Sequence, residues 1–459
     1  MLKNNYIGSK DFYKSTLAIA LPIMIQNFIT NLVSMLDNLM VGALGTEPMS
    51  GVSIDNQLIF IYNLAIFGII SGAGIFTAQF HGKADTDGIR YTLRYKMISA
   101  VTICAAAVGI IMVFKSQLIS LYLHESESTG SIEATLNFAE QYIKIILWGF
   151  LPFAVAQVFA GTLRETGETV APMIMGFIAV FTNCILNYIL IFGKFGAPAL
   201  GVRGAAIATV VSRYTECICI IIYTIKKKQR FEYIDGSFRS LHIPRNLAWQ
   251  ITLKATPLLL NEFFWSLGIS LLSMGYSLHG INVVAGYSIS STVMNLFNIA
   301  FLSLGSSIGI IVGKQLGAGS FDEAVDTVRK MMVFCVAVSV FVSFLVFLSG
   351  DFVTTLYKTN QESKNYAAYF IRVSGFLLPF ISISNASYFT LRSGGKTWIT
   401  VLFDSVFVMC ISVPAVFLLY RTGLDIHIIF PLVQSLEILK ATFGIILLRK
   451  RLWVNNIVE

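Results

Sequence analysis

Long apolar runs, separated by short polar segments, fill almost the whole chain. Each run holds about 20 residues or more, the length that an α-helix needs to cross the hydrocarbon core of a bilayer. The strands of a membrane barrel would be about ten residues long and would alternate in polarity, so the runs predict helices. Twelve are predicted, over residues 15–43, 52–79, 97–114, 139–163, 169–193, 204–225, 250–278, 283–313, 331–350, 366–391, 397–420 and 427–448. The predicted fold class is an all-α membrane protein of twelve transmembrane helices in two pseudo-symmetric six-helix lobes.

The two lobes follow from a pattern that occurs twice. Residue 14 falls on residue 249 and residue 85 on residue 320 without a gap, at a constant shift of 235 positions. A second block, residues 162–169, falls on residues 390–397 at a shift of 228. Repetition at about half the chain length indicates internal duplication. The identical pairs include Pro22 and Pro257, Gly45 and Gly280, Asn63 and Asn298, and Thr169 and Thr397.

A polar segment near the midpoint divides the halves. It begins with Lys-Lys-Lys-Gln-Arg and separates the sixth predicted helix from the seventh. We therefore predict an N-terminal six-helix lobe over residues 1–225, a cytoplasmic linker over 226–249 and a C-terminal six-helix lobe over 250–459.

Composition supports a membrane protein and charge gives its orientation. Hydrophobic residues make up 55% of the chain and charged residues 13%, whereas soluble proteins carry about 25% charged residues. The net charge of +8 could suggest nucleic-acid binding, but Lys and Arg concentrate in alternate loops. With the N-terminus in the cytoplasm, 22 of them lie in inside segments and six in outside loops. The positive-inside rule then predicts a multi-pass protein of the plasma (inner) membrane with both termini cytoplasmic and no nucleic-acid partner.

The first predicted helix carries a polar stripe that lipid would not tolerate. Polar residues from Asn27 to Asn38 recur at spacings of three, four and seven, which places them on one helical face. Asp37 lies about 12 Å inside the outer boundary, at 1.5 Å per residue, where an ionised carboxylate costs about 2.5–3.5 kcal/mol. Two interpretations stay open: a neutral Asp that fixes helix packing, or a carboxylate that couples transport to an ion. Asp37 is interpreted as the only unpaired carboxylate in the membrane part of the N-terminal half.

The C-terminal half repeats this arrangement with a different acid. Asn261 and Glu262 follow Pro257 beside three aromatic residues. A buried carboxylate near aromatic rings suits an organic cation, so we predict that Glu262, Asn38, Asn261 and Asn295 bind substrate. Two further intramembrane pairs, Arg213 with Glu216 and Glu437 with Lys440, have opposite charges three residues apart and are interpreted as structural.

The chain lacks the sequence patterns of an enzyme. A phosphate-binding glycine loop, His-Glu-x-x-His and Gly-x-Ser-x-Gly are all absent. Duplication with polar residues inside a helical bundle is typical of a secondary transporter. Each half has an even number of helices, so the halves should be related by an axis along the membrane normal, with a central cavity between them.

Several motifs resemble those of one transporter family. Pro22 through Asp37 to Gly45 resembles the first-helix signature of multidrug and toxic compound extrusion (MATE) transporters. The block Leu163-Arg164-x-x-Gly167-x-Thr169 with Asn183, and Gly204-Ala205-Ala206-x-Ala208-Thr209, resemble its helix 5–6 region. The resemblance covers essentially the whole chain. It implies export of drug-like, often cationic compounds, driven by inward Na⁺ or H⁺.

The resemblance also assigns residues. Asp37, Asn183 and Thr209 match the family's N-lobe coupling site, where Asn187 stands in place of a second Asp found in many members. Glu262 matches the C-lobe glutamate, while the helix 10 acid of some members is missing. Glu262 would then act alone or with Asp404. The loss of one carboxylate favours H⁺ over Na⁺, because Na⁺ prefers several anionic oxygens.

We therefore expect an antiporter for drugs or organic cations. It would contact membrane lipid, act as a monomer and need no cofactor or metal beyond its coupling H⁺ or Na⁺, with Asp37, Asn183, Asn187 and Thr209 as the ion-coupling set. The alternative of related architecture is a flippase for a lipid-linked or polysaccharide precursor. A flippase should have a strongly cationic cavity, which the unpaired Asp37 and Glu262 disfavour. An enzyme or receptor is a third, less favoured class.

Overall fold

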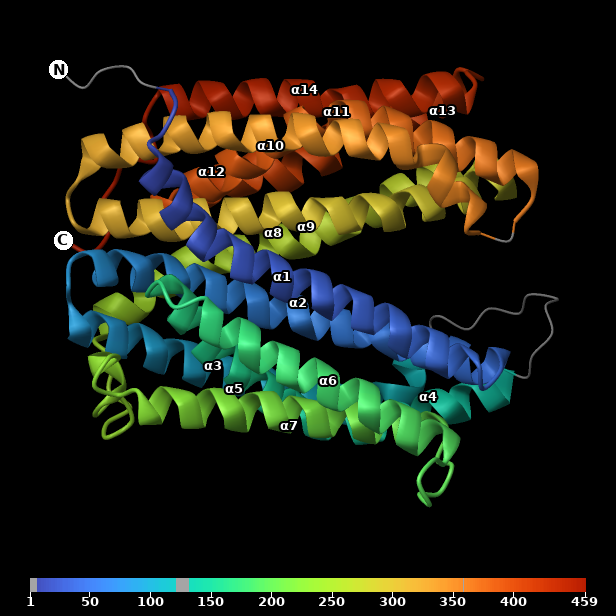
Figure 1. Ribbon diagram of the computed structural model, residues 1–459, viewed down its shortest axis with the longest axis horizontal. Coiled ribbons are helices and arrows are strands. Elements are labelled where there is room, and N and C mark those ends of the chain that lie inside the picture. The colour runs from blue at the N-terminus through green and yellow to red at the C-terminus, as the bar shows by residue number, and fades with distance from the viewer. Residues whose placement is uncertain (1–5, 121–131, 358) are drawn as a thin grey trace. The chain divides into compact units, whose positions relative to one another are not determined.

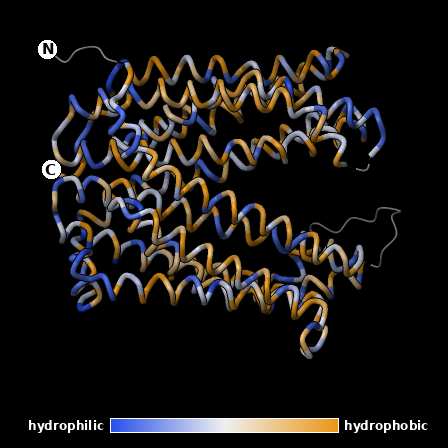
Figure 2. Tube along the Cα trace, viewed as in Figure 1, coloured by the Kyte–Doolittle hydropathy of each residue, from blue (hydrophilic) through white to orange (hydrophobic). Residues whose placement is uncertain are grey.

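The structure is a computed structural model that describes residues 6–120, 132–357 and 359–459. Over these residues the chain forms twelve helical segments long and apolar enough to span a membrane, which confirms the predicted fold class. Residues 121–131, in the predicted loop between the helices over 97–114 and 139–163, lie outside the described residues. So does Lys358, one of the six Lys and Arg residues assigned to outside loops. In Figure 2 hydrophobic residues follow the lengths of the helices, while hydrophilic residues gather at their ends and in the connecting loops.

The N-terminal half supplies six spans. Their elements are α1 (Lys10–Gly42), α2 (Thr46–Gly82), α3 (Thr86–Ser120), α4 (Ile132–Ile146) with η1 (Leu147–Gly149) and α5 (Phe150–Glu165), α6 (Val170–Phe192) and α7 (Val202–Lys226). Figure 1 labels the seven α-helices. A short 3₁₀ turn, η2 (Glu232–Ile234), lies in the following linker.

The C-terminal half supplies the other six spans. Their elements are α8 (Arg245–Ser277), α9 (Ile281–Gly317), α10 (Phe321–Thr355), α11 (Gln361–Ser393), the segments α12 (Thr397–Val401), η3 (Leu402–Val406), η4 (Val408–Ser412) and α13 (Val413–Arg421), and α14 (Ile426–Arg449). The segments η3 and η4 are π-helical. Such turns occur mostly as single-turn bulges in α-helices and often lie at functional sites.

The duplication is visible in the helix boundaries. The helices α1, α2 and α3 begin at residues 10, 46 and 86, and α8, α9 and α10 begin at 245, 281 and 321, always 235 positions later. Each corresponding pair also has the same length: 33, 37 and 35 residues. The three-helix units therefore correspond residue for residue.

Glycines repeat for a packing reason. A Cβ added at Gly51 of α2 would lie 2.9 Å from both the Thr135 oxygen and the Ala139 nitrogen of α4. A Cβ at Gly286 of α9 would lie 3.0 Å from the Ala367 nitrogen of α11. Only glycine lets these helix backbones approach so closely. Gly51 thus fixes which face of α2 is turned toward α4.

The helices are longer than their apolar runs. The third helix was predicted to begin at residue 97, but α3 begins at Thr86. Its polar first turns are held by the linker: Arg94 donates to the carbonyl oxygens of Ser237 at 2.5 Å and His242 at 2.9 Å. Hydropathy detects the part of a helix that lies in lipid, so it misses ends that are stabilised by hydrogen bonds outside it.

The described residues form two compact units. Unit 1 comprises the described parts of Met1–Met24, Ala78–Asp85 and Leu253–Glu459, and unit 2 those of Ile25–Thr77 and Thr86–Thr252. Both α1 and α2 therefore contribute residues to each unit. Within unit 2, α5 and α6 each pack against α7, and within unit 1, α9 and α10 each pack against α11. The division of the chain into lobes over residues 1–225 and 250–459 stays a prediction.

Candidate functional site

Unit 2 contains a cavity of about 300 Å³. Residues from α1, α2, α4, α5, α6 and α7 line it. Much of its wall is apolar or aromatic, and its polar groups include Asp37, Asn187, Thr209 and Arg213. A mostly apolar wall with a few converging polar groups is the usual form of a small-molecule site, and this volume lies at the lower end of such sites.

The four residues predicted to couple an ion meet at this cavity. The amide nitrogen of Asn187 donates to Asp37 Oδ1 at 2.5 Å and to Asn183 Oδ1 at 3.2 Å. Asn183 and Asn187 lie one turn apart on α6, so both side chains project from the same face. Thr209 of α7 lies 3.3 Å from the Asn183 nitrogen. The structure brings the four together, and their binding of an ion stays a prediction.

The amide of Asn183 lies between Thr209 and Asp37. One end faces the Thr209 hydroxyl at 3.3 Å, and the other end lies 2.9 and 3.0 Å from the two Asp37 oxygens. The hydrogen-bonding groups on both sides are satisfied when the nitrogen faces Asp37, and an amide nitrogen suits a carboxylate. The Asn183 contact therefore fits a charged Asp37.

The cavity wall also carries a cation and stacked aromatic rings. The guanidinium of Arg213 lies 4.5 Å from the centre of the Phe153 ring and 3.8 Å from Glu216. Tyr62 stacks on Phe150 at 4.0 Å between ring centres. The pair Arg213–Glu216 was interpreted as structural, and the structure in addition places Arg213 on the cavity wall.

One buried carboxyl group was not among the residues predicted from the sequence. Asp37 was interpreted as the only unpaired carboxylate in the membrane part of this half, and that was wrong. Asp55 of α2 is 0% exposed, and in the part of the chain that the structure describes neither of its carboxyl oxygens has a hydrogen-bond partner. The available signal was an acidic residue inside an apolar run, four positions after Gly51.

A second polar cluster lies in unit 1. The Tyr388 hydroxyl donates to Glu262 Oε1 at 3.2 Å, and Asn261 donates to Asp404 Oδ2 at 3.0 Å. Asp404, in the π-helical segment η3, also accepts from Lys440 at 2.7 Å. The cluster thus joins α8, α11, η3 and α14.

The Lys440 contact changes one interpretation. Lys440 was paired with Glu437, but that distance is 4.0 Å, longer than the 2.7 Å to Asp404. The side chains of Lys440 and Asp404 are only 8% and 15% exposed. Asp404 is therefore the main ion-pair partner of Lys440. Among the described residues no cation lies at ion-pair distance from Glu262, the other acid of this cluster.

The predicted substrate-binding residues fall into separate places. Asn261 and Glu262 belong to the unit 1 cluster, while Asn38 lines the cavity of unit 2. Asn295 is exposed on α9. Asn295 was predicted from its position along the helix alone, and of the four residues it is the one that the structure places in neither the cavity nor the unit 1 cluster.

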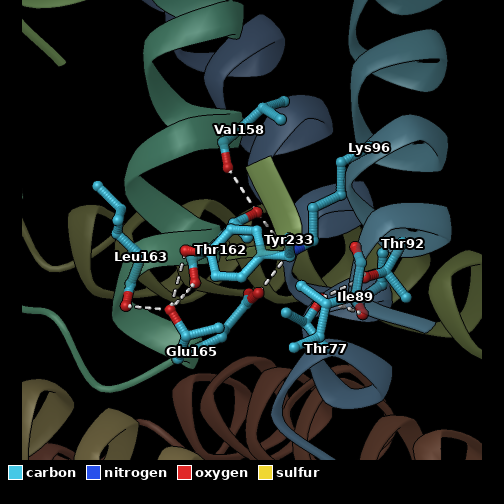
Figure 3. Close-up of polar contacts among 11 residues, drawn as sticks. Thr77, Ile89, Thr92, Lys96, Val158, Thr162, Leu163, Glu165 and Tyr233 are labelled. Carbon is cyan, nitrogen blue, oxygen red and sulfur yellow. Dashed lines mark hydrogen bonds and ion pairs between the residues drawn. The ribbon is translucent and has the colours of Figure 1, made fainter. Parts of the chain in front are cut away.

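A buried ion pair stabilises the helices of unit 2. In Figure 3 the Lys96 side chain points from α3 toward Thr162 and Glu165 of α5. Lys96 is fully buried, forms an ion pair with Glu165 and donates to the Thr162 hydroxyl at 3.2 Å. The Tyr233 hydroxyl of the linker lies 3.2 Å from Thr166, at the end of α5. This network fixes α3, α5 and the linker, and its buried charges neutralise each other.

Comparison with known proteins gives consistent results. The family model described as MatE matches residues 22–189 and 257–418, so it matches once in each half, and the two matches begin 235 residues apart. A probable multidrug resistance protein NorM of Thermotoga maritima is 25% identical over 92% of this chain and 89% of its own. A probable multidrug resistance protein YoeA of Bacillus subtilis is 24% identical over 90% of this chain and 88% of its own.

A solved structure shows the same fold. It is described as the outward-facing conformation of a multidrug resistance MATE family transporter, and it is 18% identical to this chain. It covers 95% of each chain with a TM-score of 0.85.

Proposed function

We propose, from the premise that this chain belongs to the MatE family of multidrug efflux transporters, that it exports drug-like organic cations in exchange for protons. The chain is a transporter rather than an enzyme. The observation that carries the proposal is the contact of Asp37 with Asn183 and Asn187 at the wall of the unit 2 cavity.

The composition of the Asp37 cluster favours a proton over Na⁺. Asp37 is the only acid among the four clustered residues, and its partners are two amides and a hydroxyl. Hard cations are held best by several carboxylate and carbonyl oxygens. Both amide nitrogens can donate to Asp37, and such donors would have to turn away before a metal ion could bind there. A proton needs only the carboxylate.

Coupling follows if protonation changes the preferred conformation. Protonation turns one Asp37 oxygen into an O–H donor that faces the amides, so the interactions between α1 and α6 differ in the two protonation states. A ligand can shift a conformational equilibrium only by its differential affinity for the two states. A substrate cation would favour the carboxylate and a proton would neutralise it, so the two would bind in alternation.

Electrostatics also favours an organic cation as substrate. Asp37 lies on a cavity wall with Tyr62, Phe150 and Phe153, and aromatic faces attract cations that have lost part of their hydration. Glu262 beside Tyr388 would provide a second acidic contact in unit 1. A lipid-precursor flippase would need several cations for a pyrophosphate, whereas Arg213 is the one basic residue that lines the described cavity.

The test is transport by purified protein in proteoliposomes. An imposed pH gradient should drive uptake or release of tetraphenylphosphonium, and an equal Na⁺ gradient should not. Transport driven by Na⁺ alone would contradict proton coupling, and transport of a lipid-linked pyrophosphate instead would favour the flippase.

The orientation of the chain is part of the proposal. We propose that both termini and the linker face the cytoplasm, as the distribution of Lys and Arg indicates. The protein would then lie in the plasma membrane with its substrate leaving the cell.

A further inference from the structure

Asp55 is a fully buried acid that the proposed mechanism does not use. It lies on α2 and is 0% exposed. Within the described residues, both of its carboxyl oxygens lack a hydrogen-bond partner. Buried ion pairs such as Lys96–Glu165 have a local counter-charge, but no described cation lies at ion-pair distance from Asp55.

The position of Asp55 places it directly behind the cavity wall. Its neighbours along the helix, Val52 and Asn56, line the cavity. Gly51, one turn earlier, packs against the backbone of α4, so Asp55 projects from the same face toward α4. There it faces the backbone of Ile143, without a hydrogen bond of good geometry, and interacts electrostatically with Tyr142.

Tyr142 connects Asp55 with the coupling cluster. Tyr142 lines the cavity, and its hydroxyl also interacts electrostatically with Asp37 of α1 and Arg213 of α7. The remaining titratable groups nearby are Tyr62 on α2 itself and Cys104 of α3, which interact with each other. The two carboxyl groups, Asp37 and Asp55, thus share one tyrosine neighbour.

An unpartnered carboxylate is not stable in such surroundings. Transfer of an isolated charge into an apolar interior costs far more than a lost hydrogen bond, and the group takes up a proton instead. A purely structural position would be better served by an apolar residue of similar size, because a buried polar group without a partner is itself unfavourable. Asp55 is therefore a group whose charge must be balanced by a proton whenever the site is closed to water.

We propose that Asp55 is a second proton-binding site that exchanges its proton with the water of the adjacent cavity. The inference rests on the proposed proton coupling and deepens it. The step is a plain proton transfer: a hydronium ion in the cavity gives a proton to the Asp55 carboxylate and is left as water, and the reverse step returns the proton. Asn187 leaves the Asp37 cluster with one carboxyl group, and Asp55 supplies the second on a different helix.

The number of exchanged protons tests this inference. Binding of tetraphenylphosphonium to the full-length transporter is measured calorimetrically in two buffers of different ionisation enthalpy, which yields the protons released per substrate bound. We expect Asp55→Asn to lower that number by up to one, and the double variant Asp37→Asn/Asp55→Asn to release none. Glu47→Gln removes a carboxyl group from the first turn of the same helix and should leave the number unchanged.

A second readout separates proton binding from a structural effect. Infrared difference spectra on substrate binding should contain the carbonyl band of a protonated carboxylic acid that Asp55→Asn removes. Asp55→Glu keeps a carboxyl group and should keep the proton number. If Asp55→Asn released as many protons as the wild type and kept the infrared band, the second site would be refuted while proton coupling stood. If the wild type released none, proton coupling and this inference would both fall.

Discussion

Asn187 donates a hydrogen bond of 2.5 Å to the carboxyl group of Asp37, from a helix 150 positions further along the chain. Hydrogen bonds to charged groups contribute more than neutral ones, so this contact favours the carboxylate. Asn183, one turn earlier on the same helix, also donates to Asp37 when its nitrogen faces the carboxyl group, so both asparagines favour the charged form.

The variant Asp37→Asn should bind substrate but not concentrate it. The amide resembles the protonated acid at nearly constant volume and keeps hydrogen-bonding capacity, so the protein should fold and reach the membrane. Proton-driven export should fall to the rate of passive exchange. Proteoliposomes with an imposed pH gradient measure this, with Glu47→Gln as the control. Unimpaired gradient-driven export would leave Asp37 as a packing residue.

Asn187→Asp should introduce a response to Na⁺. The change places a second carboxylate beside Asp37, on the face that already carries Asn183, and gives a cation several anionic oxygens. We expect Na⁺ binding by isothermal calorimetry where the wild type shows none, and partial stimulation of export by a Na⁺ gradient. Asn187→Ala, which removes the donor without adding charge, should show neither effect. Equal Na⁺ responses in all three proteins would contradict the assignment.

Glu262→Gln should weaken the binding of cationic substrates more than that of neutral ones. The amide oxygen still accepts from the Tyr388 hydroxyl, which lies 3.2 Å from Glu262, so shape is retained while charge is lost. An exposed or partly screened charge contact is worth about 1 kcal/mol, or roughly fivefold in affinity. Paired binding measurements on a cationic and a neutral dye test this. Equal losses for both would point to coupling or packing instead.

Lys440→Met should destabilise the protein strongly. Removing one member of a buried ion pair leaves an uncompensated charge and costs about 3–5 kcal/mol, and Asp404 would be the group left behind. The double variant Asp404→Asn/Lys440→Met should recover most of the loss. The matched control is Arg372→Met, whose ion pair with Asp351 is 42% and 73% exposed, since exposed pairs contribute about 0–1 kcal/mol. Thermal unfolding in detergent measures all three, and equal effects at both pairs would refute the argument.

Cysteines introduced at positions 240 and 194 should react with a thiol reagent from opposite sides of the membrane. Ser240 is exposed in the linker and Lys194 is exposed between α6 and α7. A membrane-impermeant thiol reagent applied to intact cells should modify Lys194→Cys and spare Ser240→Cys until the membrane is opened. The wild type, with its native cysteines, serves as background. External labelling at position 240 would reverse the proposed topology.

Much of the fold could be predicted from the sequence because lipid imposes simple rules. Twelve apolar runs give twelve spans, and the unbroken match of residues 14–85 with 249–320 anticipates helices of equal length. The helix ends could not be predicted, because α3 extends to Thr86 through contacts of Arg94 with linker carbonyls. Those contacts join segments more than 140 positions apart. The spacing of apolar residues along one helix carries no information about contacts between segments so far apart in the sequence.

The candidate site, like the fold, could be predicted from the sequence only in part. Asp37, Asn183, Asn187 and Thr209 could be chosen because helical spacing and motif resemblance both point to them. Asp55 was overlooked because a single acid in an apolar run has no periodic partner. The pairing of Lys440 with Asp404 rather than Glu437 could not be anticipated either, since it joins different helices through a π-helical segment.

The two π turns of the Thr397–Arg421 span have a consequence for the history of the chain. Its counterpart, Val170–Phe192, has 23 residues, and the C-terminal span has 25. Thr169, just before the first span, corresponds to Thr397, the first residue of the second, at a shift of 228, whereas the ends of the two spans, Phe192 and Arg421, differ by 229. Counted from equal starting points the C-terminal span is therefore longer by one residue, and a π turn accommodates one extra residue within a helix. The halves have thus diverged by insertion in the very helix that carries Asn183 and Asn187 in one and Asp404 in the other.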